Sequence, residues 1–470
     1  MDHTSFFTRR DFLIGASAFG TVTLALWAGG CDSCANQIAN RPKRRNIATM
    51  AANDSDLTTY QDAVTKMKAL PSSDHRNWAN QAQIHFDHCP HGNWWFLPWH
   101  RAYLLYFEKI CRQLTGNKSF ALPYWNWTSN PTIPNAFWGS GNPLFDSNRG
   151  QPQGATADPS FVGPAVIQNI LNQTNFFLFA SNSAVNQRDF GGYGMLEGTP
   201  HNYIHGWISG DMGAFHSPLD PIFWTHHNML DCLWVDWNIN LNNANSSDTH
   251  WTNFQFTDFF DENGNPVTVD VITTVLYPIF LYQFEPCAPN EKGSSMSSKQ
   301  LEQFLKAGAP ANLNILQRFE LQQQITGEIG KPVVGSIKVD EEALRKAFEG
   351  TAKEHVVMTI ADVTLPEKND FFVRIFVDKT DATPQTPLDD PHYAGSFAFF
   401  FDPSAMHDMA GHGKPGYLVD MTPALRKLSQ AGSLSPGSVN ISLVPVPFPG
   451  REAGGLRFTI GHLELAVAQY

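Results

Sequence analysis

Five of the chain's 17 histidines lie within residues 199–227, TPHNYIHGWISGDMGAFHSPLDPIFWTHH. A stretch of this length holds about one histidine on average at this composition, so the cluster indicates metal coordination rather than scattered core packing. His201 and His205 are four residues apart, which places both on one face of a helix. Thr199 and Pro200 are favoured at a helix N-cap and first turn, and they predict that this helix begins at Thr199.

A second helix is predicted to begin at Asp220-Pro221 for the same reason, and it carries the adjacent pair His226 and His227. Neighbouring residues on a helix point about 100° apart. One histidine of this pair is therefore expected to face the first helix.

Four further histidines lie within residues 85–100: His85, His88, His91 and His100. His91 and His100 converge if the former lies in a loop and the latter in a first helical turn, which Pro98 permits. Residues 77–84 have a helix-compatible composition and can bring in His85. The pattern predicts two sites of three histidines each, on helices that pack as a four-helix bundle.

Three neutral imidazoles without cysteine or carboxylate suit copper, zinc or iron. Structural zinc sites usually include cysteine, and di-iron sites in helix bundles use several glutamates that neither cluster offers. Two facing all-histidine triads therefore favour a pair of copper ions over a structural zinc site.

Length and composition restrict the remaining possibilities. A chain of 470 residues predicts two or three domains, and 42% hydrophobic residues provide a core. Six cysteines are too few for a disulfide scaffold. The net charge of −12 argues against a nucleic-acid-binding protein.

Residues 1–45 are expected to be an export leader. Residues 8–13 (TRRDFL) precede an apolar run that is too short and too glycine-rich to span a membrane, and together they resemble a bacterial twin-arginine signal. This predicts a periplasmic or secreted protein without a stable membrane span. Residues 41–45 (RPKRR) are expected to be a solvated linker, or otherwise a processing site.

Composition divides the rest of the chain. All 13 tryptophans lie between Trp27 and Trp251, and residues 289–298 (PNEKGSSMSS) resemble a linker. We predict a histidine-rich domain at 46–290, a linker at 291–330 and a C-terminal domain at 331–470. The linker is expected to hold a short helix around Lys299–Lys306. Apolar runs in the C-terminal domain predict a helix at 340–348 and strands at 355–365, 371–377, 396–401, 438–446 and 456–467, which fit a smaller β-sandwich.

Both histidine clusters lie in longer motifs. The first is Cys89-Pro90-His91-Gly92 with residues 96–104 (FLPWHRAYL), and the second is residues 201–205 (HNYIH) with residues 217–227 (SPLDPIFWTHH). In order and spacing they resemble the two copper motifs of the tyrosinase and polyphenol oxidase family, whose dicopper site is called type 3. Residues 370–374 (DFFVR) and 394–397 (AGSF) are similar to the C-terminal domain of plant polyphenol oxidases.

The resemblance implies a set of ligands for each copper ion. It assigns His85, His91 and His100 to the first ion and His201, His205 and His227 to the second. His88 is close enough to compete with His85. The resemblance also implies that His226 supports the ligands from behind, that Phe215 is a gate above the second copper, and that Phe223 helps to exclude water.

The cysteines are expected to have two different roles. The Cys89-x-His91 spacing looks like the version of the family in which a cysteine forms a thioether to a ligand histidine, which would fix the orientation of that ligand. Cys111, Cys232 and Cys287 are expected to be core thiols.

The resemblance implies oxidation of small phenols by dioxygen: ortho-hydroxylation of monophenols and oxidation of o-diphenols to o-quinones. Glu197 matches a position that holds a water in the family, and Asn202 can orient that water to deprotonate a monophenol. The alternatives are a catechol or o-aminophenol oxidase with little hydroxylase activity and a reversible oxygen carrier. The C-terminal domain is expected to shield the copper site with a side chain that the sequence does not identify. A homo-oligomer is an open alternative.

Overall fold

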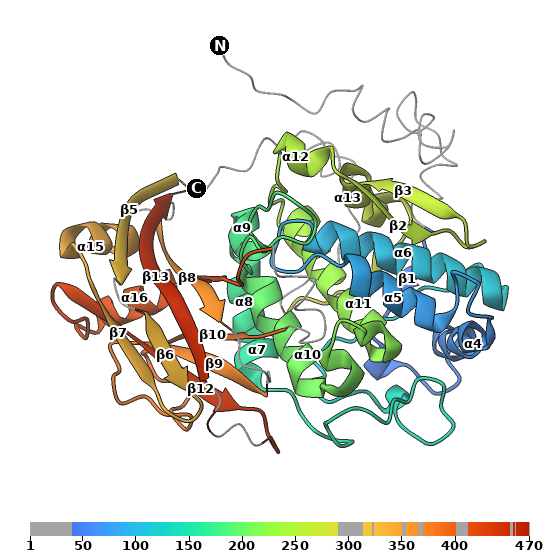
Figure 1. The fold of residues 1–470 in the computed structure, drawn as a ribbon, viewed down its shortest axis with the longest axis horizontal. Coiled ribbons are helices and arrows are strands. Elements are labelled where there is room, and N and C mark those ends of the chain that lie inside the picture. Colours follow the sequence, from blue (N-terminus) through green and yellow to red (C-terminus); the bar gives the residue numbers. More distant parts are fainter. Residues whose placement is uncertain are drawn as a thin grey trace, which may run out of the picture.

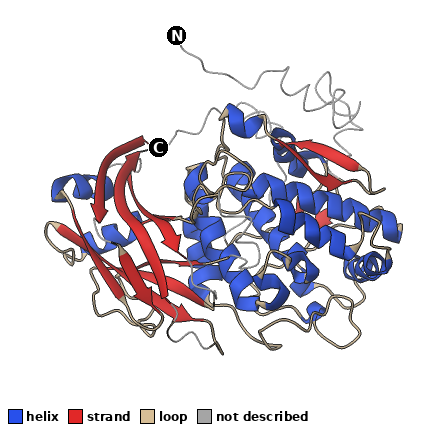
Figure 2. Ribbon diagram, viewed as in Figure 1, coloured by secondary structure: helices blue, strands red, loops and turns tan. Residues whose placement is uncertain are grey.

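The computed structural model describes residues 40–289, 314–321, 324–349, 354–364, 370–400, 412–451, 455 and 457–469. Up to residue 289 they form a mainly helical domain, and from residue 314 onward a sheet-rich C-terminal domain beside it (Figures 1 and 2). This arrangement confirms the prediction of a mainly helical domain followed by a smaller sheet-rich domain. Within the described ranges, no helix has the length and apolar character needed to cross a membrane.

The helical domain contains α4 (Ser55–Ala69), α5 (Trp78–His88), α6 (Phe96–Thr115), α7 (Pro159–Val162), α8 (Pro164–Leu171), α9 (Phe176–Phe179), α10 (Asn202–Ile208), α11 (Ile222–Val235), α12 (Thr249–Thr252) and α13 (Val271–Phe280). Two short strand pairs complete it: β1 (Lys43–Arg44) with β4 (Gln283–Phe284), and β2 (Gln255–Phe260) with β3 (Pro266–Asp270). The clustered histidines lie on or beside four helices, α5, α6, α10 and α11. The predicted bundle also has four helices.

One of the two predicted helix starts, at Asp220-Pro221, agrees with the structure. Asn77 caps α5 by accepting from the amide of Ala79 at 2.9 Å, and Asp220 accepts from the first amide of α11 at 3.0 Å. The predicted N-cap at Thr199 is wrong. A π-helical turn, η4 (Glu197–His201), runs directly into α10 and holds Pro200 inside the helix. The wider turn accommodates the missing N–H of proline, so the helix begins earlier than a proline signal suggests.

The C-terminal domain is a β-sandwich with two helices. Its strands and helices are β5 (Asn314–Leu321), β6 (Ile325–Glu328), β7 (Val333–Lys338), α15 (Glu341–Glu349), β8 (Glu354–Thr364), β9 (Phe371–Val377), β10 (Tyr393–Ala398), β11 (Tyr417–Asp420), α16 (Thr422–Gln430), β12 (Ser438–Pro447) and β13 (Arg457–Gln469). One antiparallel sheet has the order β10-β9-β12-β7, the other has the order β11-β8-β13-β5, and β6 also pairs with β13. Side chains of both sheets share one hydrophobic core.

Two predicted segment boundaries need correction. Strands β5 and β6 lie inside the range 291–330 that was predicted as linker, so the C-terminal domain begins before residue 331. The edge strand β5 is largely polar and only its Phe319 is fully buried, which hides it from a hydrophobic pattern. The predicted leader 1–45 also ends too late, because Lys43–Arg44 form β1. Residues 8–13 and the predicted helix at 299–306 lie outside the described residues.

Backbone pairing and side chains join the two domains. The amide of Tyr193 donates to the carbonyl of Gly416 at 2.7 Å, and the amide of Leu418 donates back to the carbonyl of Tyr193 at 2.9 Å. A loop of the helical domain thus continues the sheet beyond β11. Arg374 on β9 forms an ion pair with Asp158 at 2.9 Å. These contacts hold the end of β10 against α10, next to the histidine clusters.

Candidate metal centre

The first group of histidines is built from α5, a loop and α6. The ring of His85 lies 5.3 Å from the ring of His91 and 5.5 Å from that of His100, and the latter two are 5.6 Å apart, measured between centroids. His91 lies in the loop before α6 and His100 in its second turn. The loop places His91 where a continuous helix would turn it away.

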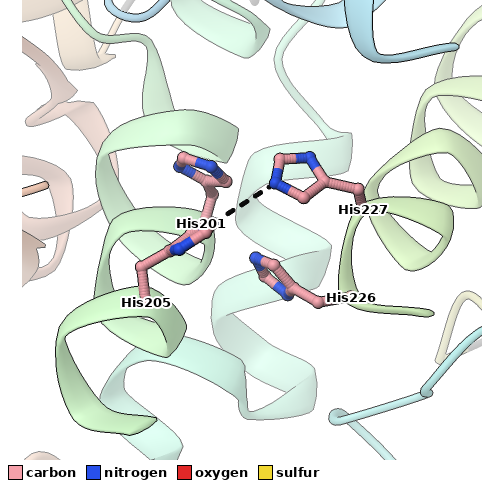
Figure 3. A group of neighbouring side chains, drawn as sticks. All are labelled: His201, His205, His226 and His227. Atoms are coloured by element: carbon pink, nitrogen blue, oxygen red, sulfur yellow. Dashed lines mark hydrogen bonds between the residues drawn. The ribbon is translucent and has the colours of Figure 1, made fainter. Parts of the chain in front are cut away.

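The second group comes from η4, α10 and α11. Its ring centroids are separated by 4.5 Å between His201 and His205, 5.0 Å between His201 and His227, and 5.4 Å between His205 and His227 (Figure 3). The two groups face each other. The rings of His100 and His227 stack at 4.2 Å, and those of His91 and His201 lie 5.5 Å apart. The structure thus brings together all six predicted ligands.

Hydrogen bonds fix which nitrogen of each ring points inward. Nδ1 lies 2.6 Å from the carbonyl of Phe215 in His85, 2.8 Å from that of Phe96 in His100, 2.6 Å from that of Met212 in His205, and 2.8 Å from Oδ1 of Asn202 in His201. Carbonyl oxygens only accept, so each Nδ1 carries the hydrogen and each Nε2 keeps its lone pair. Histidine ligands of metals are commonly oriented in this way.

Most of the inward nitrogens have no hydrogen-bond partner in the described part of the chain. Among the described residues, none forms a hydrogen bond to Nε2 of His85, His91, His100 or His201, although all four atoms are buried. Nε2 of His205 and Nε2 of His227 lie 3.2 Å apart. Buried polar atoms without partners are costly, and a metal ion at each triad would satisfy them. The donor set therefore fits two ions that prefer imidazole, such as copper.

Burial also sets the charge of these rings. It lowers the pKa of every histidine in the two groups, to about 3 for His100 and for His205. The imidazoles are therefore neutral near pH 7, which is the form that binds metals.

His226 and His88 differ in how they relate to the two groups. His226 is buried on α11 beside His227, and its ring stacks on His201 at 5.6 Å. Ring nitrogens of His227 lie within 4.8 Å of ring nitrogens of His85 and His100, so His227 faces both triads. His226 is close enough that its ring nitrogen lies within the same distance of those of His201, His205 and His227. His88 points away: its side chain is 46% exposed and lies 3.7 Å from Asp258.

Glu197 is buried one helical turn before His201. Its carboxylate accepts from the amide of Gly92 at 2.8 Å and from the hydroxyl of Ser181. Burial raises the pKa of Glu197 well above its ordinary value, although both hydrogen bonds act in the opposite direction. Because Gly92 follows His91, this carboxylate connects the loop of the first group to the helix of the second.

Aromatic side chains enclose the two triads. The ring of Phe223 lies 4.2 Å from that of His227. Phe215 stacks on His91 at 5.4 Å, so it lies on the side of the first group and not above the second as predicted. Its position follows from its own backbone, because its carbonyl binds His85.

Phe400 of the C-terminal domain contacts both triads. Its ring lies 4.2 Å from His205, 4.9 Å from His91 and 5.6 Å from His201, and it is 1% exposed. The sequence analysis did not identify this residue. The only signal was the aromatic run at residues 397–401, which fits a buried strand equally well. Ser181 was also missed, and its sequence context carries no signal.

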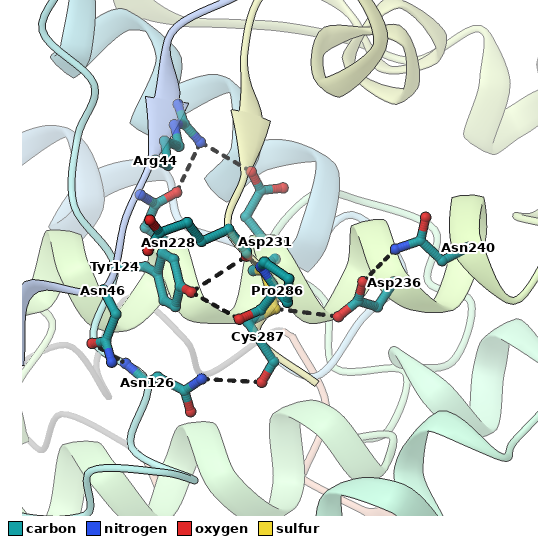
Figure 4. The surroundings of a disulfide bond; sticks show 12 residues. Arg44, Asn46, Tyr124, Asn126, Asn228, Asp231, Asp236, Asn240, Pro286 and Cys287 are labelled. Atoms are coloured by element: carbon teal, nitrogen blue, oxygen red, sulfur yellow. Dashed lines mark hydrogen bonds and ion pairs between the residues drawn. A yellow bond between two sulfur atoms is a disulfide. The ribbon is translucent and has the colours of Figure 1, made fainter. Parts of the chain in front are cut away.

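A buried ion network holds α6 and α11 together. Arg44 donates from Nε to Glu108 of α6 at 2.9 Å. Its Nη1 donates to Asn228 and Asp231 of α11 at 2.8 and 3.1 Å (Figure 4). Its guanidinium carbon lies 3.5 Å from the ring centre of Tyr282. The prediction of a solvated basic linker at 41–45 is therefore wrong for Arg44, because distant acidic residues neutralise its charge in the core.

A disulfide fastens the end of the helical domain to the same helix. Cys232 of α11 is bonded to Cys287, 55 residues later, and both sulfurs are buried (Figure 4). The prediction of core thiols is wrong for these two residues, because the chain returns to α11 after α13. Cys111 and Cys89 are free and buried. Sγ of Cys89 lies 3.3 Å from Nδ1 of His91.

The chain is similar to known proteins over most of the helical domain. Residues 58–179 and 148–240 match the family model described as the common central domain of tyrosinase. Polyphenol oxidase A1, chloroplastic, of Vicia faba is 32% identical over 279 residues, which are 50% of this chain and 46% of that protein. A tyrosinase of Hahella sp. (strain CCB-MM4) is 29% identical over 311 residues, 52% of this chain and 64% of that protein. The chain thus spans about half the length of the first relative.

The likeness extends to the C-terminal domain in a solved structure. Latent apple tyrosinase has a TM-score of 0.64 with this chain at 22% identity, and the match covers 91% of this chain and 97% of that one. This likeness concerns the fold. Residues 58–240 thus match the central domain of the tyrosinase family, and the fold has the plant-like architecture, in which a sheet-rich domain follows the helical one.

Proposed function

We propose that this protein is a dicopper phenol oxidase. The observation that carries the proposal is the convergence of six neutral, buried imidazoles in two facing triads, with Nε2 directed inward. His85, His91 and His100 would hold one copper ion, and His201, His205 and His227 the other. Bound copper would supply the redox chemistry by carrying electrons from the phenol to dioxygen.

The proposed substrates are small phenols, with dioxygen as co-substrate. Two o-diphenols and one dioxygen give two o-quinones and two waters. One monophenol and one dioxygen give one o-quinone and one water. The alternative is a catechol or o-aminophenol oxidase with little activity on monophenols.

Glu197 supports the monophenol reaction. A phenol must lose its hydroxyl proton before its oxygen can bind the metal, and a buried carboxylate with a raised pKa is a suitable acceptor. Ser181 and the amide of Gly92 orient this carboxylate. We assign Asn202, beside His201, to orienting the water that carries the proton.

Two covalent features belong to the proposal. The short distance between Cys89 and His91 supports a thioether between them, which would fix the ligand loop. The disulfide between Cys232 and Cys287 supports export, because disulfides persist mainly in oxidising compartments. We therefore retain export by the twin-arginine route to the periplasm or medium as part of the proposal.

We further propose that the chain is latent and that Phe400 closes the site. A phenylalanine ring has the shape of a phenol without its hydroxyl, and this ring rests on histidines of both triads. A phenol cannot occupy the same space while the C-terminal domain is docked.

Metal loading and paired kinetics test the function. We expect the chain, after incubation with a copper salt and removal of the excess, to retain about two copper ions. After trypsin treatment it should consume one dioxygen for every two molecules of 4-methylcatechol. Atomic absorption and an oxygen electrode measure these quantities. Retention of zinc in preference to copper, or oxygen binding without consumption of the diphenol, would contradict the proposal.

Shortening Phe400 tests the latency. Burying a phenylalanine side chain is worth about 1.5–3 kcal/mol, so Phe400→Ala should raise the rate of 4-methylcatechol oxidation by the uncleaved chain about 10–100-fold. Phe399→Leu is the matched control, since Phe399 is equally buried but packs in the core of the C-terminal domain. Equal activation by both variants would mean that loosening of the domain, and not loss of the plug, opens the site.

A further inference from the structure

The C-terminal domain contacts the metal centre in two chemically different ways. The ring of Phe400 fills space over the histidines. Two residues earlier in the chain, the carbonyl of Ala398 accepts a hydrogen bond from Nδ2 of Asn202 at 3.0 Å. A neighbouring contact has the same form, because the hydroxyl of Thr199 donates to the carbonyl of Ser396 at 3.0 Å. Asn202 is completely buried in this arrangement.

The side-chain amide of Asn202 forms one hydrogen bond within the helical domain and one with the C-terminal domain. Its Oδ1 accepts from Nδ1 of His201 at 2.8 Å, and both residues of this contact belong to the helical domain. Its Nδ2 donates to Ala398, so this contact is lost when the domain leaves. In the docked state, one of the two N–H groups on Nδ2 is therefore directed at a backbone carbonyl and is not available to a water oxygen.

The two contacts should affect two substrate classes differently. Phe400 excludes any phenol ring by its volume. The carbonyl of Ala398 affects proton transfer, and monophenol oxidation depends on proton transfer more than diphenol oxidation does. The anion of an o-diphenol is stabilised by a hydrogen bond from its second hydroxyl, whereas a monophenol has no such internal donor and depends on a base in the site.

We propose that the C-terminal domain determines which phenols are oxidised and not only whether they are. The carbonyl of Ala398, by holding the amide of Asn202, suppresses monophenol hydroxylation, and Phe400 blocks both reactions. The suppressed step is the break of the phenolic O–H bond: the proton passes to the water beside Glu197 and the electron pair stays on the phenolic oxygen. This inference rests on the proposed function.

The ratio of the monophenol rate to the diphenol rate tests this proposal. Copper-loaded Phe400→Ala is assayed uncleaved and after trypsin, which has sites at Lys292, Lys299 and Lys306, followed by separation of the fragments. The substrates are 4-methylphenol and 4-methylcatechol, which differ by one hydroxyl. A positioned base contributes ~10²–10⁴-fold, so removal of the domain should raise the ratio of the monophenol rate to the diphenol rate at least about tenfold.

The outcomes separate this inference from the proposed function. An unchanged ratio with good diphenol oxidation would overturn the inference and leave the function intact. A released helical domain that retains its tryptophan fluorescence and its copper but oxidises neither substrate would overturn the function itself.

A second variant gives a readout other than activity. Asn202→Asp keeps an acceptor for His201 but turns a carboxylate oxygen toward the Ala398 carbonyl, so trypsin should release the C-terminal domain of the metal-free protein about tenfold faster than in the wild type. Thr199→Val is the matched control, because it removes the neighbouring interdomain bond without contacting His201. It should speed release by a few-fold and leave the substrate ratio of uncleaved Phe400→Ala low. Unchanged release from Asn202→Asp, or a raised ratio in the control, would overturn the inference.

Discussion

Replacing Arg44 with alanine is expected to lower the free energy of unfolding of the helical domain by about 3–5 kcal/mol. Arg44 is completely buried, and its guanidinium neutralises Glu108 and Asp231, which are also buried. Without Arg44, the two carboxylates, which lie on adjacent helices, lose part of the positive charge that neutralises them. Breaking a buried ion pair in this way costs more than the pair contributes, because the remaining charge stays in the core.

Other positive groups do not replace it fully. Arg101 also contacts Asp231, and Arg112 contacts Glu108, so one cation remains for each carboxylate. Arg112 and Glu108 both lie on α6, whereas the pair of Arg101 on α6 with Asp231 on α11 still joins the two helices. Arg44 adds contacts to both helices from a single guanidinium, which also donates to Asn228. We therefore expect the variant to weaken the packing between the two helices that carry His100 and His227 and to retain less copper as well.

The neighbouring residue provides the control. Arg45 pairs with Asp54 and Asp56 at the surface, with a side chain that is 33% exposed, and Arg45→Ala should cost no more than about 1 kcal/mol. Urea unfolding followed by tryptophan fluorescence isolates the helical domain, because the C-terminal domain contains no tryptophan. Equal midpoints for the two variants would show that the buried network does not support this domain.

Local patterns predicted the parts of the site that depend on local structure. The i, i+4 spacing of His201 and His205 and the proline after Asp220 were sufficient to predict both histidine helices of the second triad. Strands with apolar runs, such as β9 and β12, were found for the same reason. Their side chains are buried on both faces or in alternation, and the sequence carries that signal directly.

The residues that were misjudged act through distant partners. Arg44 lies 64 residues from Glu108 and 187 from Asp231, and an arginine in a basic run is normally exposed. Phe400 stands in the same aromatic sequence context as the other phenylalanines of the run 397–401. Which of these rings reaches the histidines depends on how the C-terminal domain docks. Six cysteines in 470 residues likewise gave no reason to pair Cys232 with Cys287.

Replacing His85 with alanine should abolish one copper site, whereas replacing His88 should not. The two residues lie on the same helix within one turn, and the sequence did not decide between them. In the structure, Nδ1 of His85 is held by the carbonyl of Phe215 and its Nε2 points into the first triad. The side chain of His88 is 46% exposed and lies beside Asp258. We expect His85→Ala to retain about one copper ion in place of two.

The loss of activity should be large. Metal ions contribute several kcal/mol to the stabilisation of a transition state, so His85→Ala should lower the rate of diphenol oxidation by the cleaved enzyme on the order of 10³-fold. His88→Ala should keep both copper ions and stay within about twofold of the wild-type rate. Copper analysis and oxygen uptake measure both effects, and the melting temperature of the metal-free protein shows whether each variant is folded. Loss of copper from His88→Ala with retention in His85→Ala would mean that α5 presents the other histidine to the first triad. Cys89, which follows α5, would then need a different approach to His91, and the thioether would lose its support.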